Sequence, residues 1–263
     1  MQAVPLGFFL FLAEFAVGVL VITALLDWDG TVSGGFLFLN GIFALAAVAS
    51  AIWLRRLLPA ERLVTYAAGR PLIGAEVAFW ALFALLGAVQ LFCIRSDRRR
   101  AGRFAGLATG AVGVGALAVS AGAYGSAIGG APVLFAALAA GALAQGAVWS
   151  GMMLGHWYLV TPLLAPRPLL RLNAGMAGVL VFQAALAAWA MAFGQIEPSV
   201  RWLYWLRVGV GIVLPLALAL PIWRTARVRS MMSATGLLYV ALGFVLAGEI
   251  IARSFFFLTG LPT

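Results

Sequence analysis

The chain alternates between long apolar stretches and short polar connectors. Eight stretches of roughly 20 residues each could cross about 30 Å of hydrocarbon. They cover residues 5–26, 35–54, 72–94, 104–123, 131–158, 171–193, 203–223 and 233–258. None shows the alternation of a barrel strand, and helices satisfy their backbone groups internally. The sequence predicts an all-α, polytopic integral membrane protein: one transmembrane helical domain over 1–263 with about eight helices, enough for two four-helix bundles.

Composition supports a membrane protein and argues against other classes. Hydrophobic residues make up 64% of the chain and charged residues 10%, more apolar side chain than one soluble core hides. The first 15 residues lack a basic region, so we expect a span there and not a signal peptide. The net charge of +9 comes from arginines in short loops, which excludes a solvated nucleic-acid-binding domain.

The arginines also predict an orientation. With an outer N-terminus, ten fall in inner connectors: Arg95, Arg98, Arg99, Arg100, Arg103, Arg167, Arg171, Arg224, Arg227 and Arg229. Five fall in outer connectors: Arg55, Arg56, Arg62, Arg70 and Arg201. This bias favours both termini outside, and we expect a multi-pass protein of a bacterial-type cytoplasmic membrane. The outer cluster at 55–70, where a short interfacial helix could form at 60–67, could dock an acidic partner.

Five charged residues lie inside apolar stretches or at their ends: Glu14, Glu76, Arg207, Glu249 and Arg253. Such groups are costly in a bilayer unless they are paired or line a cavity, and the predicted topology puts all five in the outer half. Glu249 and Arg253 are four residues apart on a helix and can pair. A network of all five is a hypothesis; the alternative for the 249–253 pair is self-neutralisation that anchors the last span.

The remaining candidate residues are few. The single histidine, His156, is typical of an aromatic belt beside Trp157 and Tyr158, or could take up protons at the inner side or act as one axial ligand. One histidine cannot give bis-histidine haem ligation, and the lone Cys93 cannot form a metal cage, so we expect no haem or metal here. Small residues of the fourth to sixth stretches predict tight packing; Gln145 and Gln183 are interhelical hydrogen-bonding or polar-lining candidates.

The outer charges and the aromatic run Phe255, Phe256 and Phe257 would suit a membrane quinone. Such a ligand needs an apolar cleft for its ring and tail, hydrogen bonds to its oxygens, and a group that accepts protons. The candidate quinone-binding or proton-relay residues are Glu14, Glu76, Arg207, Glu249, Arg253 and His156.

Two segments resemble the polysulfide/DMSO-reductase-type membrane-anchor family (NrfD-like/DmsC-like): LRVGVGIVLPLALAL at 206–220 and LAGEIIARSFFF at 246–257. The resemblance implies eight spans with both ends outside. It also implies a subunit without haem or metal that exchanges electrons between menaquinone or ubiquinone and an outer iron–sulfur subunit, usually joined to a molybdopterin-type catalytic subunit. His156 falls on the inner side, away from an outer quinone site.

We therefore expect a quinone-interacting membrane anchor of a respiratory oxidoreductase complex, quinone-reactive or without catalytic activity of its own. The alternative is a proton-coupled transporter or permease, which a broken helix facing a midplane cavity would favour. A structural or assembly subunit and a lipid-modifying enzyme are further alternatives.

Overall fold

The computed structural model describes residues 3–58, 70–161 and 164–263, with the backbone alone at 3, 70 and 71. Every regular element in these ranges is a helix. They are α1 (Ala3–Asp29), α2 (Gly34–Leu57), α4 (Arg70–Arg95), α5 (Arg99–Tyr124), α6 (Gly130–Val160), α7 (Arg167–Phe193), α8 (Arg201–Val208), η1 (Gly209–Val213), α9 (Leu214–Arg227) and α10 (Met231–Thr259). The described part contains eight helical spans long and apolar enough to cross a membrane, which confirms the all-α polytopic prediction. The short helix expected at 60–67 lies outside the described residues.

The helices extend beyond the apolar stretches. α5 begins at Arg99, where the sequence predicted a start at 104, and α7 begins at Arg167 instead of 171. A helix spanning the hydrocarbon continues through polar turns at the membrane surface, which an apolar criterion leaves out. Pro168 does not prevent the earlier start of α7, because the first helical turn needs no backbone N–H from it.

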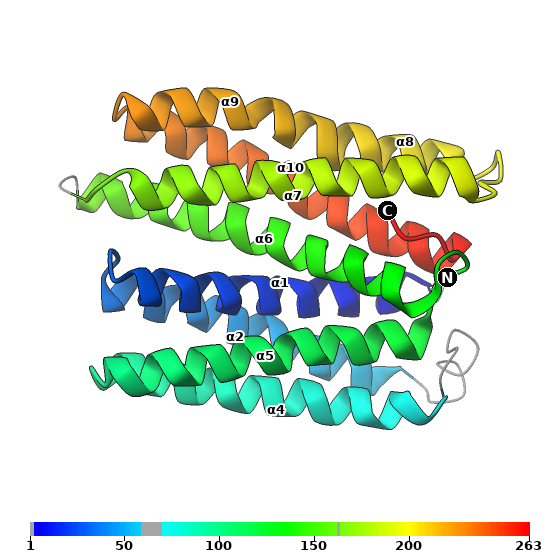
Figure 1. Cartoon of the computed structure of the whole chain (residues 1–263), viewed down its shortest axis with the longest axis horizontal. Helices are drawn as coiled ribbons and strands as arrows, with labels where there is room; N and C mark the ends of the chain where they lie inside the picture. The colour runs from blue at the N-terminus through cyan, green and yellow to red at the C-terminus, as the bar shows by residue number, and fades with distance from the viewer. Residues whose placement is uncertain (1–2, 59–69, 162–163) are drawn as a thin grey trace.

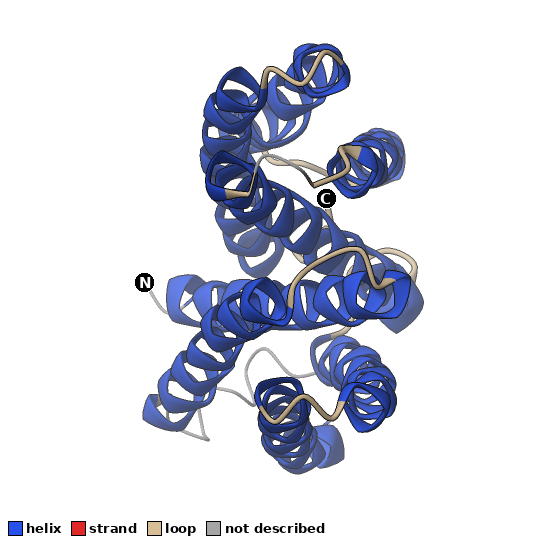
Figure 2. Ribbon diagram, turned by 90° about the vertical axis from the view of Figure 1, so that its left-hand side faces the viewer, coloured by secondary structure: helices blue, strands red, loops and turns tan. Residues whose placement is uncertain are grey.

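The spans form two four-helix bundles (Figures 1 and 2). α1, α2, α4 and α5 form the N-terminal bundle, and α6, α7, the α8–η1–α9 span and α10 form the C-terminal bundle. α1 packs along α6 at the boundary between them. A Cβ on Gly18 would collide with the backbone of Ala142, and one on Gly146 with the backbone of Gly18. Glycine at both positions lets the two helices approach more closely than any larger side chain permits.

The two bundles repeat one pattern of neighbours. In each, the second helix packs on the first and third, and the third packs on the fourth. The fourth helix of each bundle also contacts the first helix of the other, because α10 packs on α1 and α5 packs on α6. The boundary is therefore built from α1, α5, α6 and α10, and any residue pair that joins these helices ties the bundles together.

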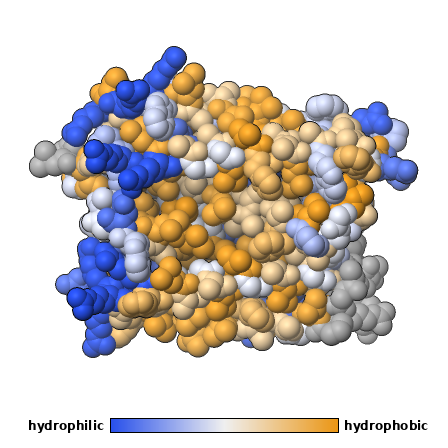
Figure 3. All heavy atoms as spheres, in the orientation of Figure 1, coloured by the Kyte–Doolittle hydropathy of each residue, from blue (hydrophilic) through white to orange (hydrophobic). Residues whose placement is uncertain are grey.

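The two ends of the molecule differ in charge. Both chain termini lie at one end, here called the terminal end (Figure 1). The turns after α1, α4, α6 and α9 lie at the other end, the arginine-rich end. This end has the ten arginines assigned above to the inner connectors, and hydrophilic residues gather there beside a broad apolar band (Figure 3). A multi-pass membrane protein has this distribution of side chains.

The seventh span is not a regular α-helix. Between α8 and α9 the backbone of η1 is π-helical, and the N–H of Leu214 donates to the carbonyl of Gly209. Pro215 follows at once and lacks a backbone N–H, which weakens the α-helical ladder at this point. A single π-helical turn inside a helix is frequent at functional sites, and this one follows directly on Arg207.

Candidate functional site

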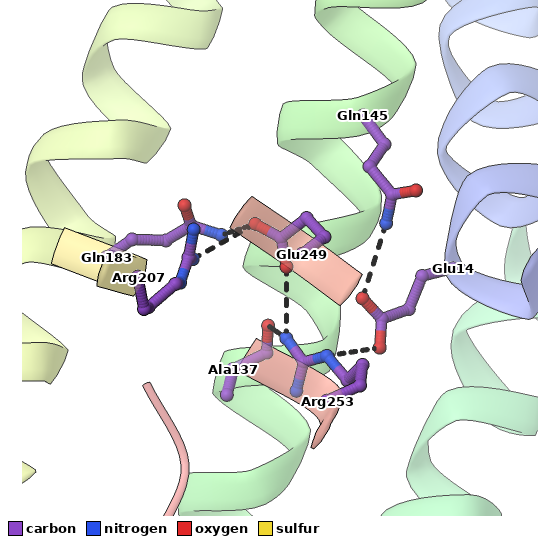
Figure 4. Close-up of polar contacts among 7 residues, drawn as sticks. All are labelled: Glu14, Ala137, Gln145, Gln183, Arg207, Glu249 and Arg253. Carbon is purple, nitrogen blue, oxygen red and sulfur yellow. Dashed lines mark hydrogen bonds and ion pairs between the residues drawn. The ribbon is translucent and has the colours of Figure 1, made fainter. Parts of the chain in front are cut away.

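Four charged side chains meet at the boundary between the bundles and form the four-charge network: Glu14, Arg207, Glu249 and Arg253 (Figure 4). The Nε of Arg253 lies 3.0 Å from Oε1 of Glu14, and its Nη2 lies 3.2 Å from Oε2 of Glu249. The Nη2 of Arg207 lies 3.0 Å from Oε1 of Glu249. The pairing of Glu249 with Arg253, expected from their helical spacing, is confirmed. Two spans of the C-terminal bundle, the α8–η1–α9 span and α10, contribute these side chains together with α1 of the other bundle.

Two glutamines and one backbone carbonyl complete the shell of the network. Gln183 on α7 donates from Nε2 to Oε1 of Glu249 at 2.8 Å. Gln145 on α6 donates to Oε2 of Glu14 at 3.4 Å, and Arg253 donates to the carbonyl of Ala137 at 3.2 Å. Both glutamines therefore make the interhelical hydrogen bonds that the sequence suggested for them.

Glycines leave the space that these side chains occupy. A Cβ on Gly141 would come within 2.7 Å of Oε2 of Glu249 and 3.1 Å of Nη2 of Arg253, and would also collide with Glu14. Gly211 and Gly248 face each other too closely for a Cβ on either, and a Cβ on Gly248 would lie 2.9 Å from Nη1 of Arg207. These glycines of α6, η1 and α10 therefore make room for the charged side chains, in addition to allowing close helix packing.

The four-charge network is fully buried and balanced in charge. All four side chains have 0% exposure, and two carboxylates face two guanidinium groups. Buried ions are tolerated only when each one is paired and hydrogen-bonded, and this condition is met for both carboxylates. Nε and Nη1 of Arg207 and Oε1 of Gln183 have no hydrogen-bond partner among the described residues.

Glu76 belongs to a separate group, the Glu76 cluster, which lies inside the N-terminal bundle. Nε of Arg55 lies 3.0 Å from Oε2 of Glu76. Ser120 donates to Oε1 of Glu76 at 2.7 Å, and the hydroxyl of Tyr124 donates to Oε2 at 3.1 Å. The glutamate is 0% exposed and the arginine 6% exposed. Three hydrogen bonds and one counter-charge therefore surround this carboxylate.

This cluster corrects two expectations. The sequence suggested one network of five charged residues, but only four of them meet. Glu76 pairs with Arg55 of α2 and not with Arg207 or Arg253. Arg55, counted above among the outer connector arginines, is buried in the last turn of α2. The sequence predicts a loop position for Arg55, because it directly follows a hydrophobic stretch. Its partner Glu76 lies 21 positions further along the chain, so no local pattern reveals the pair.

A groove opens at the terminal end beside the Glu76 cluster. Its volume is about 450 Å³, and its lining includes Tyr124, Ala127, Phe256, Phe257 and Gly260. Tyr124 packs edge-on against Phe257, with ring centroids 5.5 Å apart. Ala127 donates its N–H to the carbonyl of Gly260 at 2.8 Å, which ties the α5–α6 turn to the end of α10. Glycine is favoured at position 260 for two reasons. Its φ is +72°, and a side chain there would press against Ala127.

Tyr124 connects the groove with the buried carboxylate. It lines the groove, and its hydroxyl donates to Glu76. Sequence reasoning did not single out this tyrosine or Ser120, because neither carries a charge and both fall within an ordinary glycine-rich stretch. The three other grooves described in the structure, like this one, are not lined by any member of the four-charge network.

Candidates near the arginine-rich end lie apart from both clusters. His156 is exposed on α6, 15 residues beyond Gly141, or about 22 Å along the helix. Cys93 is buried as a free thiol. Asn40 donates to Thr23 at 2.8 Å and to Ser150 at 3.0 Å. This buried uncharged group joins α1, α2 and α6 and has no ionisable member.

The described residues contain no group of three or more His, Cys, Asp or Glu side chains that could hold a metal ion. Comparison of the chain with known protein families, with curated proteins and with solved structures finds no match. The geometry of the two clusters and of the groove is therefore the basis for a proposed function.

Proposed function

We propose that this protein is the quinone-interacting membrane subunit of a respiratory oxidoreductase complex, and that the quinone headgroup, of menaquinone or ubiquinone, binds in the terminal-end groove. The arginine bias makes the arginine-rich end cytoplasmic in a bacterial-type membrane. The terminal end, with the groove and both termini, then faces outside. A partner subunit that holds iron–sulfur centres would dock there, beside the groove.

One observation supports this proposal above the others: Tyr124 lines the groove and hydrogen-bonds to a buried carboxylate. Binding sites for small molecules are mostly apolar with a few placed polar groups, and the walls of this groove include Phe256 and Phe257. A headgroup stacked on these rings would have the tyrosine hydroxyl as its hydrogen-bonding partner. The Glu76 cluster lies directly behind that hydroxyl.

The same geometry provides a route for protons. Oxidation of a quinol to a quinone releases two electrons and two protons. The tyrosine hydroxyl can accept the first proton as it passes its own to Oε2 of Glu76, which is already its acceptor. The carboxylate is then neutral, and Ser120 and Arg55 continue to hold it in place. The second proton would leave through the groove opening to water at the terminal end, and both electrons would pass to the partner subunit.

The four-charge network is assigned a different role. Its members do not line the described grooves, so we do not place the headgroup on them. The network joins α1 to α10, and its paired charges fix how the two bundles sit together. Glu14, Arg207, Glu249 and Arg253 are therefore positioning residues in this account, and His156 takes no part in the outer site.

A proton-coupled transporter is the second candidate, and one observation favours it. The π-helical turn η1 interrupts a span next to Arg207, which bears two unpartnered buried nitrogen atoms. Interrupted helices with charges at a bundle boundary are typical of transporters. Bulk proton movement driven by a solute gradient in vesicles of the purified chain would favour this function.

The proposal is tested by mild-detergent purification of the tagged chain, followed by mass spectrometry of bound proteins and extraction of bound quinone. We expect iron–sulfur subunits and about one quinone per chain in the wild type, and less quinone in the Tyr124→Phe variant. A chain that purifies alone and free of quinone would overturn the proposal.

A further inference from the structure

A second groove runs between α1 and α5 in the half of the molecule near the arginine-rich end. It has a volume of about 650 Å³, larger than the terminal-end groove. Its lining includes Val21, Leu25 and Trp28 from α1, and Gly106, Gly110 and Val114 from α5. No charged side chain lines it. Gly106 and Gly110 deepen the groove, because a larger side chain at either position would occupy part of the space between the helices.

The mouth of this groove is basic. The guanidinium of Arg103 lies 5.8 Å from the ring centre of Trp28, and its Nε donates to the carbonyl of Asp27 at 3.2 Å. Within the described ranges this is the only hydrogen bond of that guanidinium, which leaves Nη1 and Nη2 available for a ligand. Arg103 is thus held over the groove mouth by its tryptophan and backbone contacts.

The surrounding charges are also mostly positive. Arg98, Arg99 and Arg100 immediately precede Arg103 in the loop and first turn of α5. Asp97 is 95% exposed and lies 3.9 Å from Arg99, so it offsets one of them. The buried carboxylate of Asp27 lies close enough to Arg103 and Arg99 to offset part of their charge. The mouth therefore keeps an excess of cations at the arginine-rich end of the molecule.

We propose that the α1–α5 groove binds an anionic glycerophospholipid. Its phosphate would accept hydrogen bonds from Nη1 and Nη2 of Arg103, and one acyl chain would lie along Gly106 and Gly110 toward Val114. The eight helical steps from residue 106 to residue 114 span about 12 Å, most of one leaflet of hydrocarbon. Basic pockets between helices on the cytoplasmic side are a known mode of anionic lipid recognition.

The lipid site is independent of the proposed quinone chemistry, since it occupies a separate groove with its own residues. The guanidinium group provides two parallel donors for phosphate oxygens. A zwitterionic phospholipid also has such oxygens, so this contact alone does not select an anionic lipid. Selectivity for an anionic lipid comes from the net positive charge at the mouth, because a choline or ethanolamine group would be repelled there.

The test is native mass spectrometry of the purified full chain in detergent, titrated with phosphatidylglycerol or phosphatidylcholine. We expect the wild type to retain phosphatidylglycerol preferentially. Arg103→Gln should lower its apparent affinity about fivefold, the effect of one cation beside an anionic headgroup. Arg103→Lys should keep most of the preference. Arg227→Gln is the matched control, since Arg227 is exposed at the same end but on α9.

A second pair of variants tests the acyl-chain position. A Cβ on Gly110 would make an ordinary contact of 3.6 Å with Val21, so Gly110→Leu fills the groove without a backbone collision. Gly243→Leu adds the same side chain where nothing lies within 4 Å. We expect lipid retention to fall only for Gly110→Leu. Equal retention of both lipids, equal loss in Arg227→Gln, or quinone as the molecule displaced by Gly110→Leu would overturn the proposal.

Discussion

Arg253 and Glu14 form an ion pair of 3.0 Å across the boundary between two four-helix bundles. Both side chains are 0% exposed. Arg253 also donates a hydrogen bond to Glu249 on its own helix. One guanidinium group therefore contacts a carboxylate of α10 and a carboxylate of the other bundle. Removal of one partner from such a pair strands the other charge in an apolar interior.

We therefore expect Glu14→Gln to destabilise the fold strongly. The loss should be about 3–5 kcal/mol, the range for breaking a buried pair, measured by reversible unfolding in mixed micelles. Asp29→Asn is the control: its pair with Arg171 has exposed fractions of 34% and 68% and should contribute about 1 kcal/mol or less. Similar losses in the two variants would show that the buried pair has no special importance.

The space left by Gly141 predicts a second result. Gly141→Ala places a methyl group against Glu14, Glu249 and Arg253, so it should destabilise the protein and disturb the network. Gly178→Ala on α7 meets nothing within 4 Å; it should be neutral, or stabilising by up to about 1 kcal/mol from helix propensity. Thermal unfolding in one detergent compares the two. If both alanines were tolerated alike, the close packing around the network would be refuted.

Close contact between the bundles gives a third prediction. Gly18→Ala should prevent α1 from reaching α6, because the added carbon would overlap the backbone of Ala142. We expect a large fall in the yield of folded protein, or separation of the bundles detected by proteolysis of the connecting turn at 125–129. Gly243→Ala, on an open surface, serves as the comparison. Normal yield and unchanged proteolysis for Gly18→Ala would contradict the close approach.

Sequence and structure agree on the spans and diverge on the partners of the charges. The pairing of Glu249 with Arg253 follows from local helical spacing, and so could be predicted. The pairing of Arg55 with Glu76, and their contacts with Ser120 and Tyr124, depend on how three separate helices pack. No local periodicity encodes that arrangement. Because the serine and the tyrosine are uncharged, no feature of the sequence assigned them to a buried polar cluster. The π-helical turn contains Gly211, whose close contact with Gly248 of α10 is likewise not encoded by a local pattern.

The orientation is tested by cysteine accessibility. Cys93 is the only cysteine, so Cys93→Ala provides a background without thiols. Ser199 lies in the exposed turn before α8 at the terminal end, and Ser96 lies in the exposed turn after α4 at the arginine-rich end. We expect a membrane-impermeant maleimide to label Ser199→Cys in intact cells and Ser96→Cys only after lysis. The reverse pattern would place the groove on the cytoplasmic side.

The hydroxyl of Tyr124 should matter more than its ring. Tyr124→Phe keeps the contact with Phe257 and removes one donor, so quinone affinity should fall between about twofold and tenfold, the effect of one hydrogen bond. Tyr204→Phe is the control, because that hydroxyl donates to the carbonyl of Ala187 away from the groove. Quenching of tryptophan fluorescence by a short-chain quinone measures both. A larger effect at Tyr204 would contradict the assignment.

The central claim is that a quinone headgroup binds in the terminal-end groove, and photoaffinity labelling tests it most directly. Membranes containing the wild-type chain would be irradiated with an azido-quinone, with and without excess natural quinone, and the labelled peptides sequenced. We expect competed labelling to be confined to residues 122–131 and 256–260, and to be weaker in Tyr124→Phe. Competed labelling elsewhere, or label spread evenly over lipid-facing helices and unaffected by competitor, would contradict it.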